Sequence, residues 1–217
     1  MVHCPPRAIR HDERWLGRSD RRDRARAPAT DPAEHFDYDL RTASLERRRG
    51  DGAVGGGGSD LPSGTTFDEW GIGHWAGGAE DTYERMFPPL AGELDAARIR
   101  GLPEPVIVEG AAAAQVAAFH ARGYPVAGYA GSIYEWSWWL RGMEQFLVDL
   151  LEQPDLAEAL VAKVAGFTTQ LALATAASGI DLLCFYDDAG SQSGMQISPP
   201  LWRSIIKPAW KSVLDAV

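Results

Sequence analysis

Two adjacent acids in the stretch FYDDAGSQSG, residues 185–194, are the side chains of this sequence best suited to catalysis. Asp187 and Asp188 directly follow the apolar run IDLLCFY at 180–186. Neighbouring carboxylates repel each other, so one of the two can retain a proton and serve as a general acid or base. The alternative is a plain surface loop, in which Asp188 caps a turn and Asp187 is solvated.

A second group of candidate residues lies in a predicted loop, 131–141, which follows another apolar run, at 124–130. If both runs are parallel strands of one sheet, the loops after them open on the same edge, where α/β proteins bind ligands. Aromatic walls with a few polar groups suit a small-molecule site. The candidates for substrate binding on this shared rim are Glu135, Trp136, Arg141, Tyr186 and Gln192.

Three of these residues have a structural interpretation as well. Trp136 either walls the ligand or belongs to the core, because alternate members of the Trp136–Trp139 cluster must point in opposite directions. Arg141 either binds a carboxylate or caps the adjacent helix. Gln192 either donates a hydrogen bond to substrate or lies in a mobile Ser/Gly-rich loop.

The elements that position these loops are read from periodicity and from Gly and Pro breaks. Strands separated by helices of this length imply parallel pairing through right-handed crossovers. A full (β/α)8 barrel takes about 250 residues, so the pattern predicts an α/β fold of the incomplete TIM-barrel type. The predicted elements are helices over 106–122, 143–152 and 154–179, strands over 35–40, 124–130 and 180–186, and a last helix capped by Ser198.

The chain divides into an Arg-rich tail, 1–33, predicted to be disordered, and a barrel fragment, 34–217. Within the fragment, the Gly-rich segment 47–64 is interpreted as a flexible loop, because no Gly-Lys-Ser/Thr follows it to form a phosphate cradle. The two cysteines, Cys4 and Cys184, predict no disulfide framework, and Cys184 fits a core position.

Charge and hydropathy narrow the possible partners. The formal net charge is −9, made of +3 over residues 1–50 and −12 over 51–217, so an acidic domain with no nucleic-acid surface is expected. No uncharged run approaches the roughly 18–20 residues of a membrane span, and no apolar signal segment is visible. We expect a cytoplasmic protein that binds a small-molecule substrate.

Two segments resemble the uroporphyrinogen decarboxylase superfamily, which includes the heme-pathway decarboxylase and cobalamin-dependent methyltransferases. They are GYAGSIYEWSWWLRGMEQFLVDLLEQPDLAEAL and FYDDAGSQSGMQISPPLWRSIIKPAWKSVLDAV. The segment TTFDEWGIGHWAGG looks like the approach segment of methyltransferase-like members, which implies that Trp70 and His74 adjoin the substrate. His74 is otherwise an exposed loop residue.

The resemblance implies a TIM barrel and, in a full-length parent, corrinoid-dependent methyl transfer or demethylation, with a corrinoid protein as a partner. Tetrapyrrole decarboxylation is the alternative, although the Arg-rich signature of the decarboxylases is not matched by WLGRSDRRDRARA. The methyltransferases bind zinc through cysteine and histidine ligands later in the barrel, so this fragment is expected to bind no metal. A truncated, inactive half-barrel is the third hypothesis.

Overall fold

A computed structural model describes residues 39–217, apart from 53–54, 57–60 and 78–83. The predicted tail, Cys4 and most of the predicted strand 35–40 lie outside the described residues. The described part combines helices and strands in an α/β fold.

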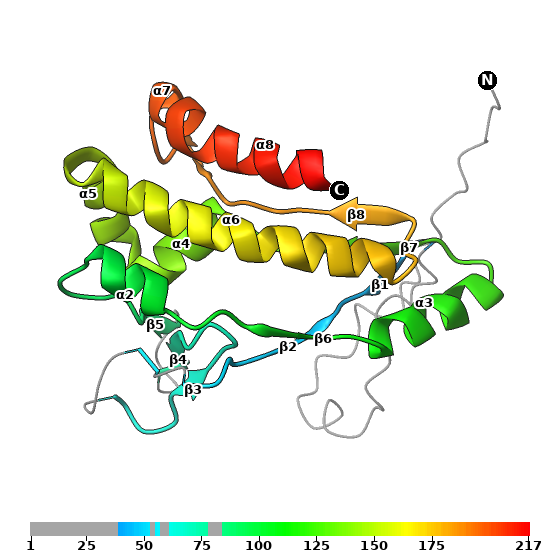
Figure 1. Cartoon of the computed structure of the whole chain (residues 1–217). Helices are drawn as coiled ribbons and strands as arrows, with labels where there is room; N and C mark the ends of the chain where they lie inside the picture. The colour runs from blue at the N-terminus through cyan, green and yellow to red at the C-terminus, as the bar shows by residue number, and fades with distance from the viewer. Residues whose placement is uncertain (1–38, 53–54, 57–60, 78–83) are drawn as a thin grey trace, which may run out of the picture. The chain divides into compact units, whose positions relative to one another are not determined.

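A small parallel sheet carries the two strands that the sequence predicted to share a rim. Its order is β1 (Arg41–Ala43), β7 (Val126–Tyr129), β8 (Leu182–Cys184), and every pairing is parallel. The register places Tyr129 beside Cys184, so β7 and β8 end at the same edge (Figure 1). The parallel arrangement is therefore confirmed, although β1 begins after the segment 35–40 that was predicted to be a strand.

Three helices connect β7 to β8: α4 (Tyr134–Arg141), α5 (Met143–Glu152) and α6 (Pro154–Ala177). The prediction that residues 131–141 form a loop is wrong, because most of them make α4. Tyr134, Ser137, Leu140 and Arg141 are buried at the spacing of one helix face. Gly142, at φ 91°, then separates α4 from α5 in a conformation that other residues avoid.

Helix α6 is the central helix of the domain. Pro154 occupies its first turn, as predicted. Among the described residues, α6 alone is long and apolar enough to cross a membrane by length and composition, but half of its most apolar window is buried within the domain. Its buried side chains include Leu160, Val164 and Phe167, so its apolar character is explained by the core that it forms.

The segment after β8 is a hairpin of β9 (Gly190–Ser191) and β10 (Gly194–Met195), followed by a broken helix. The hydroxyl of Ser198 accepts from the backbone of Leu201 and caps α7 (Pro199–Leu201), as predicted. A π-helical turn (Trp202–Ile206) precedes α8 (Lys207–Ala216). Pro208 has no N–H to donate to the carbonyl of residue 204, which accounts for the wider turn at this point.

Antiparallel pairs complete the fold. Strand β2 (Glu46–Arg48) pairs with β6 (Val106–Val108), and β3 (Thr66–Phe67), β4 (Gly73–Trp75) and β5 (Arg85–Phe87) form a separate sheet. Two more helices are α2 (Ala96–Gly101) and α3 (Ala111–Ala121). The predicted helix 106–122 is thus wrong at its start, because the β-branched residues Val106 to Val108 pair as a strand.

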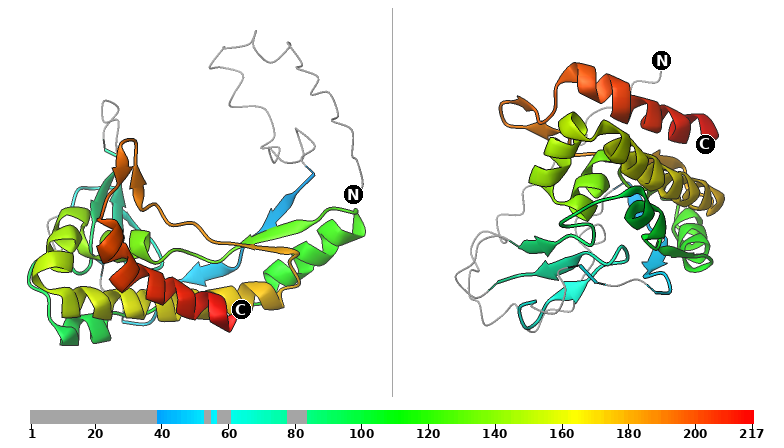
Figure 2. Two further views of the ribbon diagram at one scale, coloured as in Figure 1. Left: turned by 90° about the horizontal axis from the view of Figure 1, so that it is seen from above. Right: turned by 60° about the vertical axis from the view of Figure 1, so that its left-hand side comes forward.

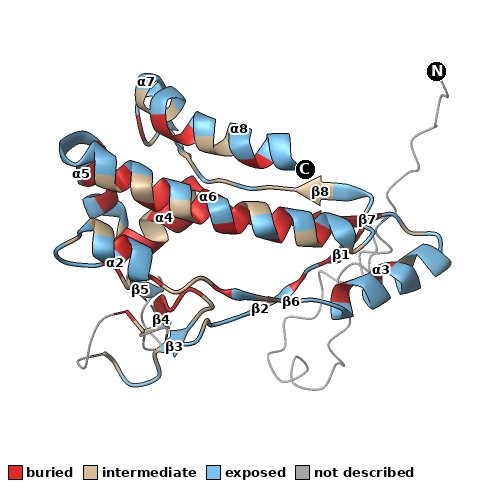
Figure 3. Ribbon diagram, in the orientation of Figure 1, coloured by how far each residue is buried: buried red, intermediate tan, exposed pale blue. Residues whose placement is uncertain are grey.

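The core lies between α6 and the elements around it, including α4, α5 and α8 (Figures 1 and 3). Turned views show α8 running alongside α6 (Figure 2). The face of the parallel sheet that points away from α6 is open within the described part. On it, Tyr129 is 42% and Leu182 51% exposed. The run 180–186 is nearly continuous in apolar residues, as in strands that helices cover on both faces, but the described residues cover β8 on one face.

Candidate functional site

Asp187 joins the carboxyl ends of β7 and β8 to the helices that follow them. Its carboxylate accepts four hydrogen bonds, a complete set for its two oxygens. The donors are Ser132 Oγ (2.6 Å), the backbone N–H groups of Tyr134 (3.0 Å) and Glu135 (2.8 Å), and Trp210 Nε1 (2.7 Å).

The effect of these bonds is to fix the start of α4. Ile133, the residue before the helix, offers no side-chain cap, and Asp187, 53 residues after Tyr134, supplies the acceptor. Gly131 makes the turn into this segment at φ 91°, where an added Cβ would meet the ring of Trp136 at 2.5 Å. Asp187 is therefore half-buried and fully hydrogen-bonded, and its position makes it an anchor of the rim.

Glu135, in the first turn of α4, is a different kind of acid. Its Oε2 atom is buried and, among the described residues, has no hydrogen-bond partner. Burial raises the pKa of Glu135, and the negative charges of Asp187 and Asp188 raise it further. The sequence placed the rim's proton carrier at the two aspartates; the electrostatics of the rim favour Glu135 for that role.

Two tyrosines flank these acids. Burial, Asp187 and Asp188 together raise the pKa of Tyr134 to about 12, and its hydroxyl donates to Gln196 Oε1 at 2.9 Å. Tyr186 is 46% exposed and packs edge-to-face on Tyr129, with ring centroids 6.4 Å apart. Burial and Glu135 raise the pKa of Tyr186, Arg47 lowers it and Glu69 raises it, so all these charges act on one region.

The ion pair between Arg47 and Glu69 was missed by the sequence analysis. Arg47 Nε lies 2.5 Å from Glu69 Oε1, and the guanidinium lies 6.0 Å from the ring of Trp136. Arg47 belongs to an Arg-Arg-Arg run that looks like part of a solvated linker. Its role depends on the pairing of β2 with β6, and no local pattern in the sequence predicts that pairing.

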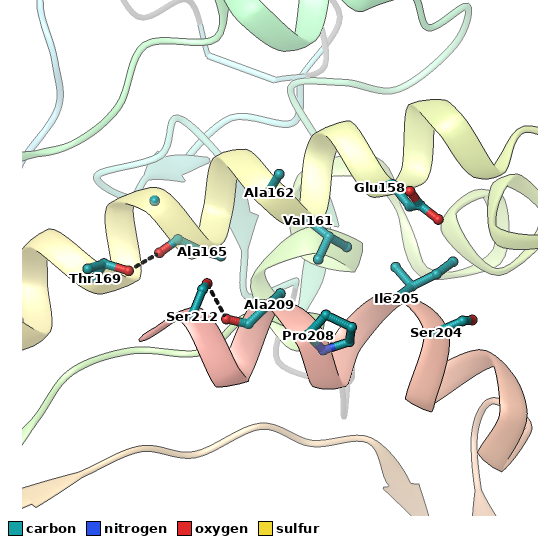
Figure 4. A pocket seen from close by; sticks show the side chains of 11 residues that line it. Glu158, Val161, Ala162, Ala165, Thr169, Ser204, Ile205, Pro208, Ala209 and Ser212 are labelled. Atoms are coloured by element: carbon teal, nitrogen blue, oxygen red, sulfur yellow. Dashed lines mark hydrogen bonds between the residues drawn. The ribbon is translucent and has the colours of Figure 1, made fainter. Parts of the chain in front are cut away.

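A cavity of about 300 Å³ adjoins the rim, and Phe185, Tyr186, Asp187, Trp210 and Leu214 line it. Its volume is at the small end of ligand pockets. A second hollow of about 360 Å³ lies between α6 and the 204–212 segment (Figure 4). Small and aliphatic side chains line most of that hollow and Glu158 is its one titratable residue, which makes it a gap in helix packing rather than a place for chemistry.

Two predicted substrate-binding tryptophans belong to the core instead. Trp70 is 2% and Trp136 3% exposed. Both rings pack on Phe167, with centroids 5.0 and 5.9 Å away. The structural interpretation of Trp136 is the one that the packing favours, and the same holds for Trp70.

Arg141 is likewise committed to the interior. Its Nε donates to Asp149 Oδ2 at 2.6 Å, and its Nη1 donates to the carbonyls of Leu90 and Gly92, both at 2.6 Å. The side chains of both partners in the ion pair are at most 3% exposed. Arg141 therefore ties α4 to α5 and to the 90–92 segment, and it does not reach the rim as a carboxylate clamp.

His74 and Gln192 were predicted to contact substrate, and each lies in another setting. The ring nitrogens of His74 lie 3.1 Å from Asp68 Oδ2 and 3.3 Å from Glu84 Oε1. Asp68 also accepts from the backbone of Ile72, so His74 stabilises a turn. Gln192 is exposed at the tip of the β9–β10 hairpin, and Gln196 is the glutamine that contacts the rim.

The described residues do not fit the metal that the superfamily resemblance implies. Among them, no three His, Cys, Asp or Glu side chains are grouped so as to hold a metal ion. The hollow of about 300 Å³ beside the rim is small compared with a corrinoid macrocycle.

Comparison with known proteins places this geometry in a family. No curated protein sequence matches the chain. A solved structure of a methyltransferase from Methanosarcina mazei is similar over 52% of this chain and 41% of its own, with 14% identity and a TM-score of 0.43, so the chain spans less than half of that protein's length. The model of the uroporphyrinogen decarboxylase family matches residues 102–217, more than half of the chain and all of the segment from β7 to α8. The chain therefore belongs to the uroporphyrinogen decarboxylase (URO-D) family.

Proposed function

We propose that the rim formed by Glu135, Tyr186, Asp187 and Asp188 is part of the active site of a corrinoid-dependent methyl-transfer or demethylation enzyme. The observation that carries the proposal is the meeting of acidic and aromatic side chains where β7 and β8 end together. In parallel α/β folds this end of the sheet is where substrates bind. In this proposal the described domain is the first part of a TIM barrel in a cytoplasmic protein.

The charge of the rim supports methyl transfer over the alternative, tetrapyrrole decarboxylation. A porphyrinogen carrying several carboxylates would meet Asp187 and Asp188, and like charges repel. Arg47, the cation whose field reaches Tyr186, is already paired with Glu69. A neutral or cationic methyl donor avoids this repulsion.

The size of the cavity supports a division of roles between two reactants. A small donor fits the roughly 300 Å³ beside Tyr186. The corrinoid would then act as a methyl acceptor presented by a partner protein to the open face of the sheet at Tyr129 and Tyr186. When bound, it supplies a cobalt nucleophile. The residues of this chain orient the donor and supply a proton to its leaving group.

The experiment is a panel of small methyl donors incubated with this protein and free cob(I)alamin, with methylcobalamin followed by absorbance. Protein-dependent methylation with at least one donor is expected. Uroporphyrinogen III is assayed in parallel for release of carbon dioxide. If carbon dioxide is released and cobalamin is not methylated, the proposal of methyl transfer is wrong and decarboxylation is the better assignment.

A second candidate is that the polypeptide is an inactive half-barrel. Within the described residues β8 is an edge strand, and Leu182 on it is 51% exposed. Exposed strand edges are rare in finished barrels. Hydrogen exchange tests this: amides of β8 that exchange far faster than those of β7 favour the inactive fragment, and equal protection of the two strands speaks against it.

A further inference from the structure

We infer that Glu135 is the proton donor of the proposed reaction: its carboxyl group donates a proton to the atom that is left with an electron pair when the bond to the transferred group breaks. The inference rests on the proposed function, because it assigns a role at the same rim. It names a proton donor that the sequence pattern placed elsewhere, at Asp187 and Asp188.

The position of Glu135 is set by its backbone, and one oxygen of its carboxyl group makes no hydrogen bond to the described residues. Its N–H donates to Asp187 Oδ1 at 2.8 Å, which fixes the first turn of α4. Its Oε2 is buried and lacks a partner among the described residues. A buried carboxylate oxygen without a donor is costly, whereas a protonated carboxyl with a ligand acceptor in reach is not.

The charged groups around Glu135 disfavour its ionised form. Asp187 and Asp188, at the end of β8, are both close enough to act on it. Arg47 on β2 is occupied by Glu69, from the turn after β3. Tyr186, which senses Glu135, and Tyr134, whose pKa is about 12, add no positive charge. The same neighbours raise the pKa of Glu135, in agreement with the geometry.

The role of Asp187 follows from the same contacts. Because four donors saturate it, its carboxylate is not free to exchange a proton with substrate. It acts as a positioning residue that orients Glu135. Asp188 is exposed, so it contributes charge to the rim rather than a buried proton.

The proton balance of the proposed step is simple. The bond between the methyl carbon and the donor's heteroatom breaks, its electron pair stays on the heteroatom, and the methyl carbon bonds to the nucleophilic acceptor. The O–H bond of Glu135 breaks as a new bond to hydrogen forms on the heteroatom. Glu135 is left as a carboxylate and regains a proton from water.

The first test measures the proton directly and needs no substrate. The full chain is labelled with ¹³C at the glutamate side-chain carboxyl, and its resonances are titrated by NMR. One resonance is expected to titrate well above the others, to vanish in Glu135→Gln and to persist in the matched variant Glu69→Gln. If the resonance lost in Glu135→Gln titrates with the remaining glutamates, the inference is overturned.

The second test asks whether the proton is used. In the reaction that the donor panel identifies, Glu135→Gln is expected to lower kcat by about 100-fold or more with little change in KM, since general acids contribute roughly 10²–10⁴-fold. Glu135→Asp should restore part of the rate, and wild-type kcat should fall as pH rises through the titration seen by NMR. Wild-type turnover in Glu135→Gln overturns the inference. If no donor reacts even with the wild-type protein, the proposed function fails, and the NMR titration alone decides whether Glu135 holds the proton.

Discussion

The two ends of the β7–β8 pair each carry an aspartate that accepts backbone N–H groups, yet their surroundings differ. At the amino end, Asp181 Oδ2 accepts from the N–H of Val126 at 2.7 Å and lies 2.7 Å from His120 Nε2. The backbone bond from Val126 and then the contact with His120 lower the pKa of Asp181. At the carboxyl end, Asp187 makes a similar anchor, and the groups beside it, Glu135 and Tyr134, have raised pKa values.

The difference separates a structural anchor from a candidate for chemistry. At the amino end the acid has a backbone N–H and a histidine as partners, and its ionised form is favoured by folding. At the carboxyl end folding places acids side by side and leaves Glu135 Oε2 without a donor. Groups whose ionised form is disfavoured by folding concentrate at active sites, and in parallel barrels stability is associated with the amino end and catalysis with the carboxyl end.

The largest effect is expected from Asp187→Asn. The amide has one oxygen in place of two, and its NH₂ group would face donors, so at least two of the four bonds are lost. Charge-assisted bonds and caps of this kind are worth about 1–3 kcal/mol each, and we expect the free energy of unfolding to fall by roughly 2–4 kcal/mol. Urea denaturation measures it, with Ser132→Ala as the control that removes one donor. A loss no larger than that of the control would mean that Asp187 is not the anchor.

A smaller loss is expected from Asp181→Asn, and it should depend on pH in one direction. Because folding lowers the pKa of Asp181, its stabilisation is present above its ordinary value of 3.8 and disappears as the pH falls through the lower folded value. The difference in unfolding free energy between wild type and variant should therefore be constant near neutrality and vanish at strongly acidic pH. His120→Ala should reproduce only part of it, since the bond from Val126 remains. A difference that grows on acidification would contradict the pairing.

The opposite dependence is expected for Glu135→Gln. Folding raises the pKa of Glu135, so above its ordinary value of 4.5 the unfolded chain loses this proton while the folded protein keeps it. Wild-type stability therefore falls with rising pH until the folded pKa is passed. Relative to wild type, Glu135→Gln should gain stability as the pH is raised from the ordinary glutamate value of 4.5 to the folded pKa of Glu135. Urea midpoints at each pH measure this, with Glu144→Gln on the exposed start of α5 as the matched control. If the stability difference between wild type and Glu135→Gln stayed constant across the pH series, folding would not raise the pKa of Glu135. The carboxyl end of the β7–β8 pair would then not differ from the amino end in this way.

Much of the fold and part of the rim could be predicted from local sequence patterns. The parallel strands, the Pro154 start of α6 and the Ser198 cap each depend on neighbouring residues, and each was predictable. The strand at Val106–Val108 was not, because only the remote partner β2 decides between strand and helix there.

The parts of the site that could not be predicted depend on distant contacts. Trp210 reaches Asp187 across 23 residues, and Glu135 meets it across 52. Nothing in the spacing says that Asp187 will be saturated while Glu135 keeps an unpartnered oxygen. A loop over 131–141 would bring Arg141 and Trp136 to the rim, whereas the helix that forms there turns both side chains inward.

The smallest effect on stability is expected from Asp188→Asn, the neighbour of the residue with the largest. Asp188 is exposed, and exposed substitutions away from special contacts usually change stability by about 0.5 kcal/mol or less. Its negative charge nevertheless helps to raise the pKa of Glu135. In Asp188→Asn the glutamate resonance that is lost in Glu135→Gln should therefore titrate at lower pH, and turnover of the proposed reaction should fall while the urea midpoint stays in place. An unchanged titration of Glu135 would show that the charge of Asp188 does not affect the pKa of Glu135. Burial and Asp187 alone would then raise that pKa.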